Sequence, residues 1–158
     1  MEKSEEIHQS RTHLLAAFKL RDSLYALDAA IVLEVIRVAE ISPVPHAPAE
    51  VIGVINLRGR IVTLIDIGLI LGFAPASISS QSRIFIVEDR GEYTGLLADL
   101  VSEVTEVADL DLQVPPANIP QEQLKYCRSV YRASGRVVLL LDTTALLESV
   151  SLASNHSQ

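Results

Sequence analysis

Short apolar runs, separated by turn residues, fill this chain from end to end, and this pattern is typical of β-strands. The segments 32–38 and 101–107 contain alternating polar and apolar positions, so we expect strands that continue to about residues 38 and 107. A short helical turn is expected from residue 29, and short helices are expected at 67–71 and 143–147, each after an aspartate at the N-cap position. The expected strands are 14–20, 24–28, 32–38, 51–57, 60–65, 83–88, 93–98, 101–107, 126–133 and 137–141.

The same series of residues occurs twice along the chain. Between Val54 and Val130 the separation is 130 − 54 = 76 positions. The motif V-x-E-V-x-x-V is also present twice, at 32–38 and at 101–107. A repeat of this kind predicts two similar modules that pack together, since about 70 residues alone bury a marginal core. At the 76-residue offset, Val54, Gly59, Arg60, Val62, Leu64 and Asp66 recur as Val130, Gly135, Arg136, Val138, Leu140 and Asp142.

The repeat and the loop composition suggest where the modules begin and end. We expect a single domain at 14–148 with two small β-barrels. Subdomain 1 is predicted at about 24–82. Subdomain 2 is predicted at about 83–142, with the N-terminal strand 14–20 and the C-terminal segment completing the pair. Segments 1–13 and 149–158 are predicted to be flexible tails.

Composition narrows the class of protein. Apolar residues make up 49% of the chain and aromatic residues only 4%, so the core must be built from Val, Ile and Leu. The formal charge of −7 and the lack of a basic stripe argue against nucleic-acid binding. The near-apolar run 61–73 is too short to span a bilayer, and the N-terminus lacks a secretory signal. We therefore expect a cytoplasmic protein without direct membrane insertion, in which the single Cys127 is a buried structural thiol.

Asp66 and Asp142 occupy matching positions in the two copies, which raises the possibility of a carboxylate-pair hydrolase of the aspartic protease type. Neither copy has the complete Asp-Thr-Gly motif of that class, because the first copy reads Asp66-Ile67-Gly68 and the second has Thr144 in place of the glycine. Two helix N-caps are the favoured interpretation. The histidines lack ligand spacing and no phosphate-binding glycine loop is present, so the sequence predicts neither a metal nor a cofactor.

Arg58 stands at the tip of a tight turn after a buried strand. An arginine held there can be an ordinary solvated turn residue, or it can anchor an interface. The run Gly53-Val54-Ile55-Asn56-Leu57-Arg58-Gly59-Arg60-Ile61-Val62, followed by Leu64-Ile65-Asp66-Ile67, resembles the signature of the chemotaxis coupling protein CheW family. The segment Val44-Pro45-His46-Ala47-Pro48 and the run Gly95-Leu96-Leu97-Ala98-Asp99-Leu100-Val101 agree with this resemblance, which covers about Leu15 to Leu147.

The resemblance implies a mainly β fold of two SH3-like five-stranded β-barrel subdomains packed together, with short helices. It implies a non-enzymatic adaptor that couples the cytoplasmic tip of methyl-accepting chemoreceptors to the regulatory domain of the histidine kinase CheA. It also implies a receptor-binding groove between the two barrels, and the partner-binding positions that match this groove are Val32, Glu34, Gly53, Arg58 and Val104. A hydrolase and a nucleic-acid-binding barrel remain as the alternatives, to be distinguished by acid-pH peptide cleavage and by salt-sensitive binding to DNA or RNA.

Overall fold

The computed structural model describes residues 11–156, and β-strands dominate it. The strands are β1 (Thr12–Leu20), β2 (Ser23–Asp28), β3 (Val32–Arg37), β4 (Val51–Leu57), β5 (Arg60–Ile65), β6 (Arg83–Asp89), β7 (Glu92–Ala98), β8 (Leu100–Ala108), β9 (Cys127–Ala133) and β10 (Arg136–Leu141). The helices are the 3₁₀ turns η1 (Ala29–Ile31) and η2 (Asp109–Asp111) and the α-helices α2 (Ile67–Ile70), α3 (Gln121–Leu124) and α4 (Thr143–His156).

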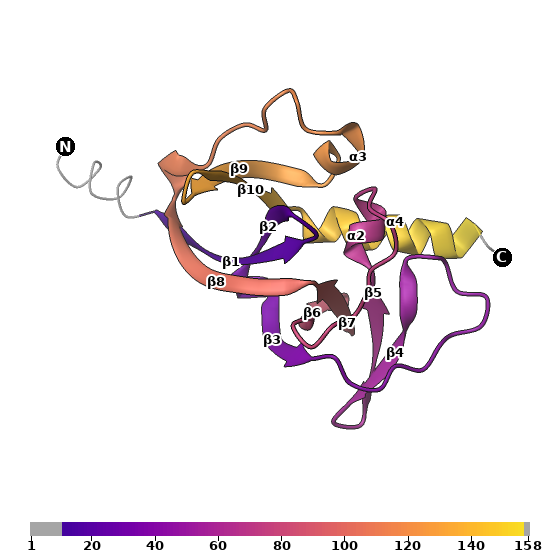
Figure 1. The fold of residues 1–158 in the computed structure, drawn as a ribbon. Coiled ribbons are helices and arrows are strands. Elements are labelled where there is room, and N and C mark those ends of the chain that lie inside the picture. Colours follow the sequence, from indigo (N-terminus) through magenta and orange to yellow (C-terminus); the bar gives the residue numbers. More distant parts are fainter. Residues whose placement is uncertain (1–10, 157–158) are drawn as a thin grey trace.

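The strands form two five-stranded sheets that lie against each other (Figure 1). Sheet A has the order β8-β1-β2-β10-β9, and sheet B has the order β3-β6-β7-β5-β4. In each sheet one neighbouring pair is parallel, β2 with β10 and β5 with β7, and the others are antiparallel. The predicted mainly β fold with two five-stranded units and short helices is confirmed.

The two sheets do not follow the expected subdomain boundaries at 24–82 and 83–142, because each sheet takes strands from both copies of the repeat. The first copy contributes β1 and β2 to sheet A but β3, β4 and β5 to sheet B. The second copy contributes β6 and β7 to sheet B and its last three strands to sheet A. The sequence repeat identifies equivalent strands, but it does not show which strands pair, because pairing is set by tertiary packing. The exchange makes each sheet depend on both copies.

Both predicted tails are partly structured. Strand β1 begins at Thr12, inside the segment predicted as a flexible tail at 1–13. Helix α4 continues to His156, so the segment 149–158 is helical over most of its length. Thr12 pairs with Ala108 of β8, and Leu146 and Leu147 bury the first part of α4 in the core between the sheets. Residues 1–10 and 157–158 lie outside the described part of the chain.

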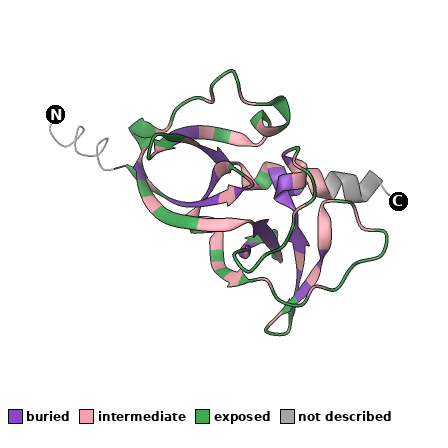
Figure 2. Cartoon of the chain, viewed as in Figure 1, coloured by how far each residue is buried: buried purple, intermediate pink, exposed green. Residues whose placement is uncertain are grey.

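The core has three clusters, so several strands bury apolar residues on both faces. Figure 2 shows buried residues on strands of both sheets and on α2. The central cluster joins sheet A, sheet B, α2 and α4, with Phe18 and Phe85 in contact at a ring-centroid distance of 5.2 Å. Each sheet also encloses a smaller cluster on its other face. In β10, for example, Leu139 and Leu141 join the central cluster, whereas Val138 and Leu140 join the cluster enclosed by sheet A.

Two arginines in hairpin turns connect the sheets. One turn of sheet A contacts the segment around α2, which follows β5 of sheet B, and one turn of sheet B contacts α4, which follows β10 of sheet A. Arg21, in the β1–β2 turn, donates from its backbone N–H to the Asp99 carboxylate at 2.6 Å and forms an ion pair with it at 3.2 Å. Its guanidinium also donates to the carbonyl of Ala74, after α2. Arg90, in the β6–β7 turn, forms a more exposed ion pair with Glu148 of α4 at 3.3 Å. These contacts reinforce the apolar joint between the sheets.

Candidate functional site

The turn between β4 and β5 holds Arg58 in a fixed position. Leu57 pairs with Arg60, so Arg58 and Gly59 alone make the turn. Their φ angles are +51° and +84°, and positive φ at both central residues matches the twist of a two-residue hairpin. The side-chain oxygen of Asn56 accepts a hydrogen bond from the Gly59 N–H at 2.8 Å. The predicted hairpin is confirmed, and its tip is braced from within.

Arg58 forms an ion pair with Glu34 that connects the two edge strands of sheet B. One guanidinium nitrogen donates to Glu34 Oε1 at 3.3 Å, and the other contacts Oε2. The carboxylate of Glu34, which accepts these hydrogen bonds, raises the pKa of Arg58. The side chain of Arg58 is 71% exposed and that of Glu34 is 32% exposed. A pair this exposed contributes little to stability, but it orients the guanidinium at the surface.

Gly53 of β4 is buried and has a structural explanation. The segment before β4 pairs with it through Ser42, whose N–H and C=O both bond to Val54 at 2.8 Å. A Cβ on Gly53 would lie 2.5 Å from the Ser42 carbonyl oxygen and 2.7 Å from Cγ2 of Ile41. Only glycine allows this approach without a shift of the backbone. Gly53 therefore fixes the outline of this edge.

The two valines among the predicted site residues have different surroundings. Val32, at the start of β3, is half-buried and packs against the central cluster. Val104 of β8 is 57% exposed, opposite Ala16 of β1. Strand β8 is the edge of sheet A, whereas the other four predicted residues belong to the edge strands of sheet B and their turn. The structure thus brings Glu34 and Arg58 into contact and places Val104 on a different sheet.

Sequence reasoning did not identify three exposed apolar residues on β3 and β5. Leu33 and Val35 of β3 are 49% and 44% exposed. Ile61 of β5 is 62% exposed although its neighbour Val62 is fully buried, because successive residues of a strand point to opposite faces. The nearby guanidinium of Arg60 covers the ring of Tyr93, 3.8 Å from its centroid. The alternating residue pattern of β3 was the one sequence signal that could have indicated apolar side chains on the solvent-facing side of this strand.

Asp66 and Asp142 are helix caps, as the favoured interpretation predicts. Asp66 accepts from the Leu69 N–H at 3.2 Å and from the Ala76 N–H at 2.9 Å. Asp142 accepts from the Ala145 N–H at 3.1 Å. Each carboxylate thus caps the start of its own helix, α2 or α4, and that of Asp66 also holds the loop after α2.

The cysteine and histidine residues that were considered for catalysis or metal binding form no such site in the part of the chain that the structure describes. Cys127 is half-buried rather than fully buried, and burial raises its pKa to about 11, so the thiol stays protonated at neutral pH. His13 contacts Asp109 at 3.0 Å. Within residues 11–156, no group of His, Cys, Asp and Glu side chains could hold a metal ion. The same part of the chain contains no helix long and apolar enough to cross a membrane.

Comparison with known proteins decides the family. The model of the CheW-like domain matches residues 15–151. The chain belongs to the CheW-like domain family. A "Chemotaxis protein CheW" of Rhizobium meliloti is 31% identical over 135 residues, which cover 85% of this chain and 87% of that protein. The protein of the same name from Treponema pallidum is 31% identical over 144 residues, 87% of this chain and 84% of that one.

A solved structure agrees with this membership. The scaffolding protein TtCheW of Thermoanaerobacter tengcongensis superposes with a TM-score of 0.75 at 29% identity, covering 85% of this chain and 86% of the other. As a CheW-like protein, the chain is a chemotaxis adaptor or scaffold and not an enzyme. The predicted adaptor function is confirmed at this level, and the hydrolase alternative receives no support from the relatives.

Proposed function

We propose that this CheW-like protein joins the cytoplasmic tip of chemoreceptors to the regulatory domain of a CheA-type histidine kinase, in the cytoplasm, without binding nucleic acid or entering the membrane. The observation that carries the proposal is the Arg58–Glu34 pair on the exposed edge of sheet B. It holds a guanidinium outward at a turn of fixed conformation. Arginine presented in this way is a frequent anchor of protein interfaces.

The surroundings of this pair suit a protein partner. Edge strands carry backbone groups that can pair with another chain, and exposed apolar residues next to them favour docking. Leu33 and Val35 supply such residues on the outward face of β3, and Ile61 supplies one on β5, just after the Arg58 turn. Val104 supplies another on the edge of sheet A. The predicted site residues Val32 and Gly53 would act by shaping the edge, since neither presents a free side chain there.

The duplication explains how one chain can serve two partners. Sheets A and B have equivalent strand orders but different side chains along their edges. A molecule with two similar but unequal faces can bind head-to-tail, and such contacts close into rings when the rotation permits. Alternation with a kinase domain of like shape would follow from this arrangement.

The test is to replace Arg58 by Ala or Glu and to measure binding of the kinase regulatory domain and of a receptor-tip fragment by calorimetry. We expect at least about tenfold weaker binding to one partner, equivalent to about 1.4 kcal/mol, since an anchor residue carries this much or more. Arg58→Glu should be the weaker binder because it places a second carboxylate next to Glu34. Thermal unfolding of both variants should change little, because the ion pair is exposed.

Arg90→Ala is the matched control. Arg90 also precedes a glycine in a two-residue turn, has a φ of +53° and has a side chain that is 68% exposed. Its loss should leave both affinities unchanged. If Arg58→Ala unfolds the protein along with the loss of binding, Arg58 is a structural residue and the proposal fails. Equal loss of binding in both variants would also count against a specific anchor.

A further inference from the structure

The repeat places a counterpart of the Arg58–Glu34 pair on the edge of sheet A, and that counterpart lacks its arginine. Glu103 of β8 is equivalent to Glu34 of β3 in the V-x-E-V-x-x-V motif. Ser134 is equivalent to Arg58, because each precedes the glycine of its hairpin turn. Both residues have a φ of +51°, so the two turns have the same conformation at this position. Sheet A thus keeps the carboxylate but carries a short hydroxyl where sheet B has the guanidinium.

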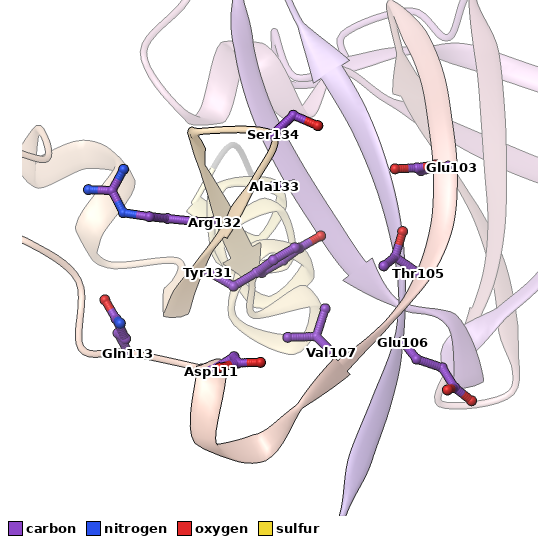
Figure 3. A pocket seen from close by; sticks show the side chains of 10 residues that line it. All are labelled: Glu103, Thr105, Glu106, Val107, Asp111, Gln113, Tyr131, Arg132, Ala133 and Ser134. Carbon is purple, nitrogen blue, oxygen red and sulfur yellow. The ribbon is translucent and has the colours of Figure 1, made fainter.

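A cavity occupies the place that the missing side chain would cross. It has a volume of about 560 Å³ and lies between β8 and β9, the two edge strands of sheet A (Figure 3). Glu103 and Ser134 face each other across it, with Thr105 on the β8 side. Asp111 adds a second carboxylate to its lining.

Tyr131 provides an independent sign that a polar ligand belongs in this cavity. Its side chain is 3% exposed, and its hydroxyl has no hydrogen-bond partner within the part of the chain that the structure describes. Figure 3 shows this hydroxyl directed into the cavity, toward Thr105. Burial first and the charge of Glu103 second raise the pKa of Tyr131, so the phenol keeps its proton. A buried hydroxyl without a partner is unusual in a folded protein, and the equivalent residue in sheet B is the apolar Ile55.

The chemistry of this lining selects a cation. Glu103 and Asp111 bring carboxylates to the lining, whereas the side chains of Glu106 and of Arg132, the one cationic residue of the lining, point away from the cavity (Figure 3). A guanidinium can donate two parallel hydrogen bonds to Glu103 and a further one to the phenol oxygen of Tyr131, while an ammonium lacks this planar fork. The pair in sheet B shows that this carboxylate position accepts an arginine in such a way.

We propose that the cavity between β8 and β9 binds an arginine side chain presented by a partner protein, which pairs with Glu103 as Arg58 pairs with Glu34. In sheet B the edge carboxylate pairs with an arginine of the same chain, and in sheet A it pairs with an arginine of the partner protein. The two edges therefore recognise different partners although they descend from one ancestral sequence. This site does not depend on which partners the chain joins, so it can fail while the proposed adaptor function stands.

The direct test is a titration of the full chain with N-acetyl-arginine methylamide, followed by nitrogen-15 NMR at low salt and neutral pH. Saturable shifts are expected at the backbone amides of Thr105, Tyr131 and Ala133. The matched citrulline derivative has the same shape without the charge and should give no saturable shift there. The lysine derivative should bind more weakly. Equal shifts with citrulline would overturn a charged site, and equal shifts with lysine would overturn the assignment to a guanidinium.

Substitutions locate the contact. Glu103→Gln should weaken binding of the arginine derivative at least about tenfold, and Tyr131→Phe should weaken it by a smaller factor. Ser134→Arg should abolish binding, because it rebuilds the ion pair of sheet B inside the cavity on a backbone that already suits arginine. Ser80→Arg, in the link before β6, adds the same charge elsewhere and should leave binding unchanged.

Thermal unfolding shows whether each variant is folded. Ser134→Arg should unfold at or above the temperature of the unmodified chain, so this variant keeps the test open if Glu103→Gln or Tyr131→Phe fails to fold. Undiminished binding by folded Ser134→Arg or Glu103→Gln would overturn the proposal. Shifts confined to Arg58 and its neighbours, or dimerisation of the chain in place of probe binding, would do the same.

Discussion

Gly53→Ala should destabilise the protein strongly, although it adds only one methyl group. The new Cβ would lie 2.5 Å from the carbonyl oxygen of Ser42. A carbon–oxygen contact needs about 3.3 Å, so the two backbones must separate by about 0.8 Å. The atom in the way belongs to the backbone, which cannot rotate aside as a side chain can.

The magnitude follows from what the separation disrupts. Two hydrogen bonds of 2.8 Å join Ser42 and Val54, and each contributes about 0.5–1.5 kcal/mol net. Overpacking against the buried strand costs about 1–3 kcal/mol more. Because the backbones can share the strain, we expect a total loss of about 2–4 kcal/mol. With a urea m-value of about 2 kcal/mol per molar, the unfolding midpoint should fall by about 1–2 M.

Urea unfolding followed by circular dichroism measures this loss, and Gly68→Ala is the matched control. A Cβ on Gly68 would lie 3.2 Å from a guanidinium nitrogen of Arg21 and 3.3 Å from Oδ1 of Asp66, so only side-chain atoms would have to shift, by a few tenths of an ångström. Alanine is also favoured over glycine in a helix by about 1 kcal/mol. Gly68→Ala should therefore be nearly neutral. A Gly53→Ala midpoint within about 0.3 M of the unmodified chain, at equal m-value, would refute the reasoning.

Hydrogen exchange adds the local readout. The Val54 amide should lose protection in Gly53→Ala, because its acceptor moves away, while amides in β10 of sheet A should change only with global stability. Uniform loss of protection without an added effect at Val54 would mean that the strain is not relieved where the structure places it.

Three further predictions concern the joint, the caps and the thiol. Arg21→Ala should lower the free energy of unfolding by about 1–3 kcal/mol in urea titrations and Arg90→Ala by less than about 1 kcal/mol, because the first ion pair is shielded and the second exposed; equal losses would contradict this. Asp66→Ala should cost about 2 kcal/mol and Asp142→Ala about 1 kcal/mol by the same measurement, since Asp66 accepts from two amides and Asp142 from one. The Cys127 pKa rises from 9.0 to about 11 on folding, so its stabilisation is complete below pH 9 and is lost as pH rises from 9 to 11. Unfolding temperatures should fall across this range, less so in Cys127→Ala, and an unchanged slope in that variant would assign the loss to other groups.

Part of the candidate site could be predicted from the sequence, and part could not. The tight turn at Arg58-Gly59 was predictable, because a glycine between two apolar strands favours a two-residue hairpin. Glu34 was predicted only through the resemblance to the family, and its contact with Arg58 depends on β3 and β4 lying at opposite ends of the strand order of sheet B. The cavity at Glu103 was not predictable, since it requires Ser134 and Tyr131 to meet β8 across the edge of sheet A.

The sequence by itself determined the strands, the turns, the capped helices and the duplication, because these depend on local periodicity and on the conformational preferences of single residues. Tertiary structure alone decided which strands pair, and it interleaved the two copies so that neither sheet belongs to one of them. It also decided that Ile61 faces solvent and that Gly53 lies under Ser42. Apolar side chains pack against many different apolar neighbours, so they do not specify which strands pair. Strand pairing is determined by the arrangement that buries most of these side chains at once.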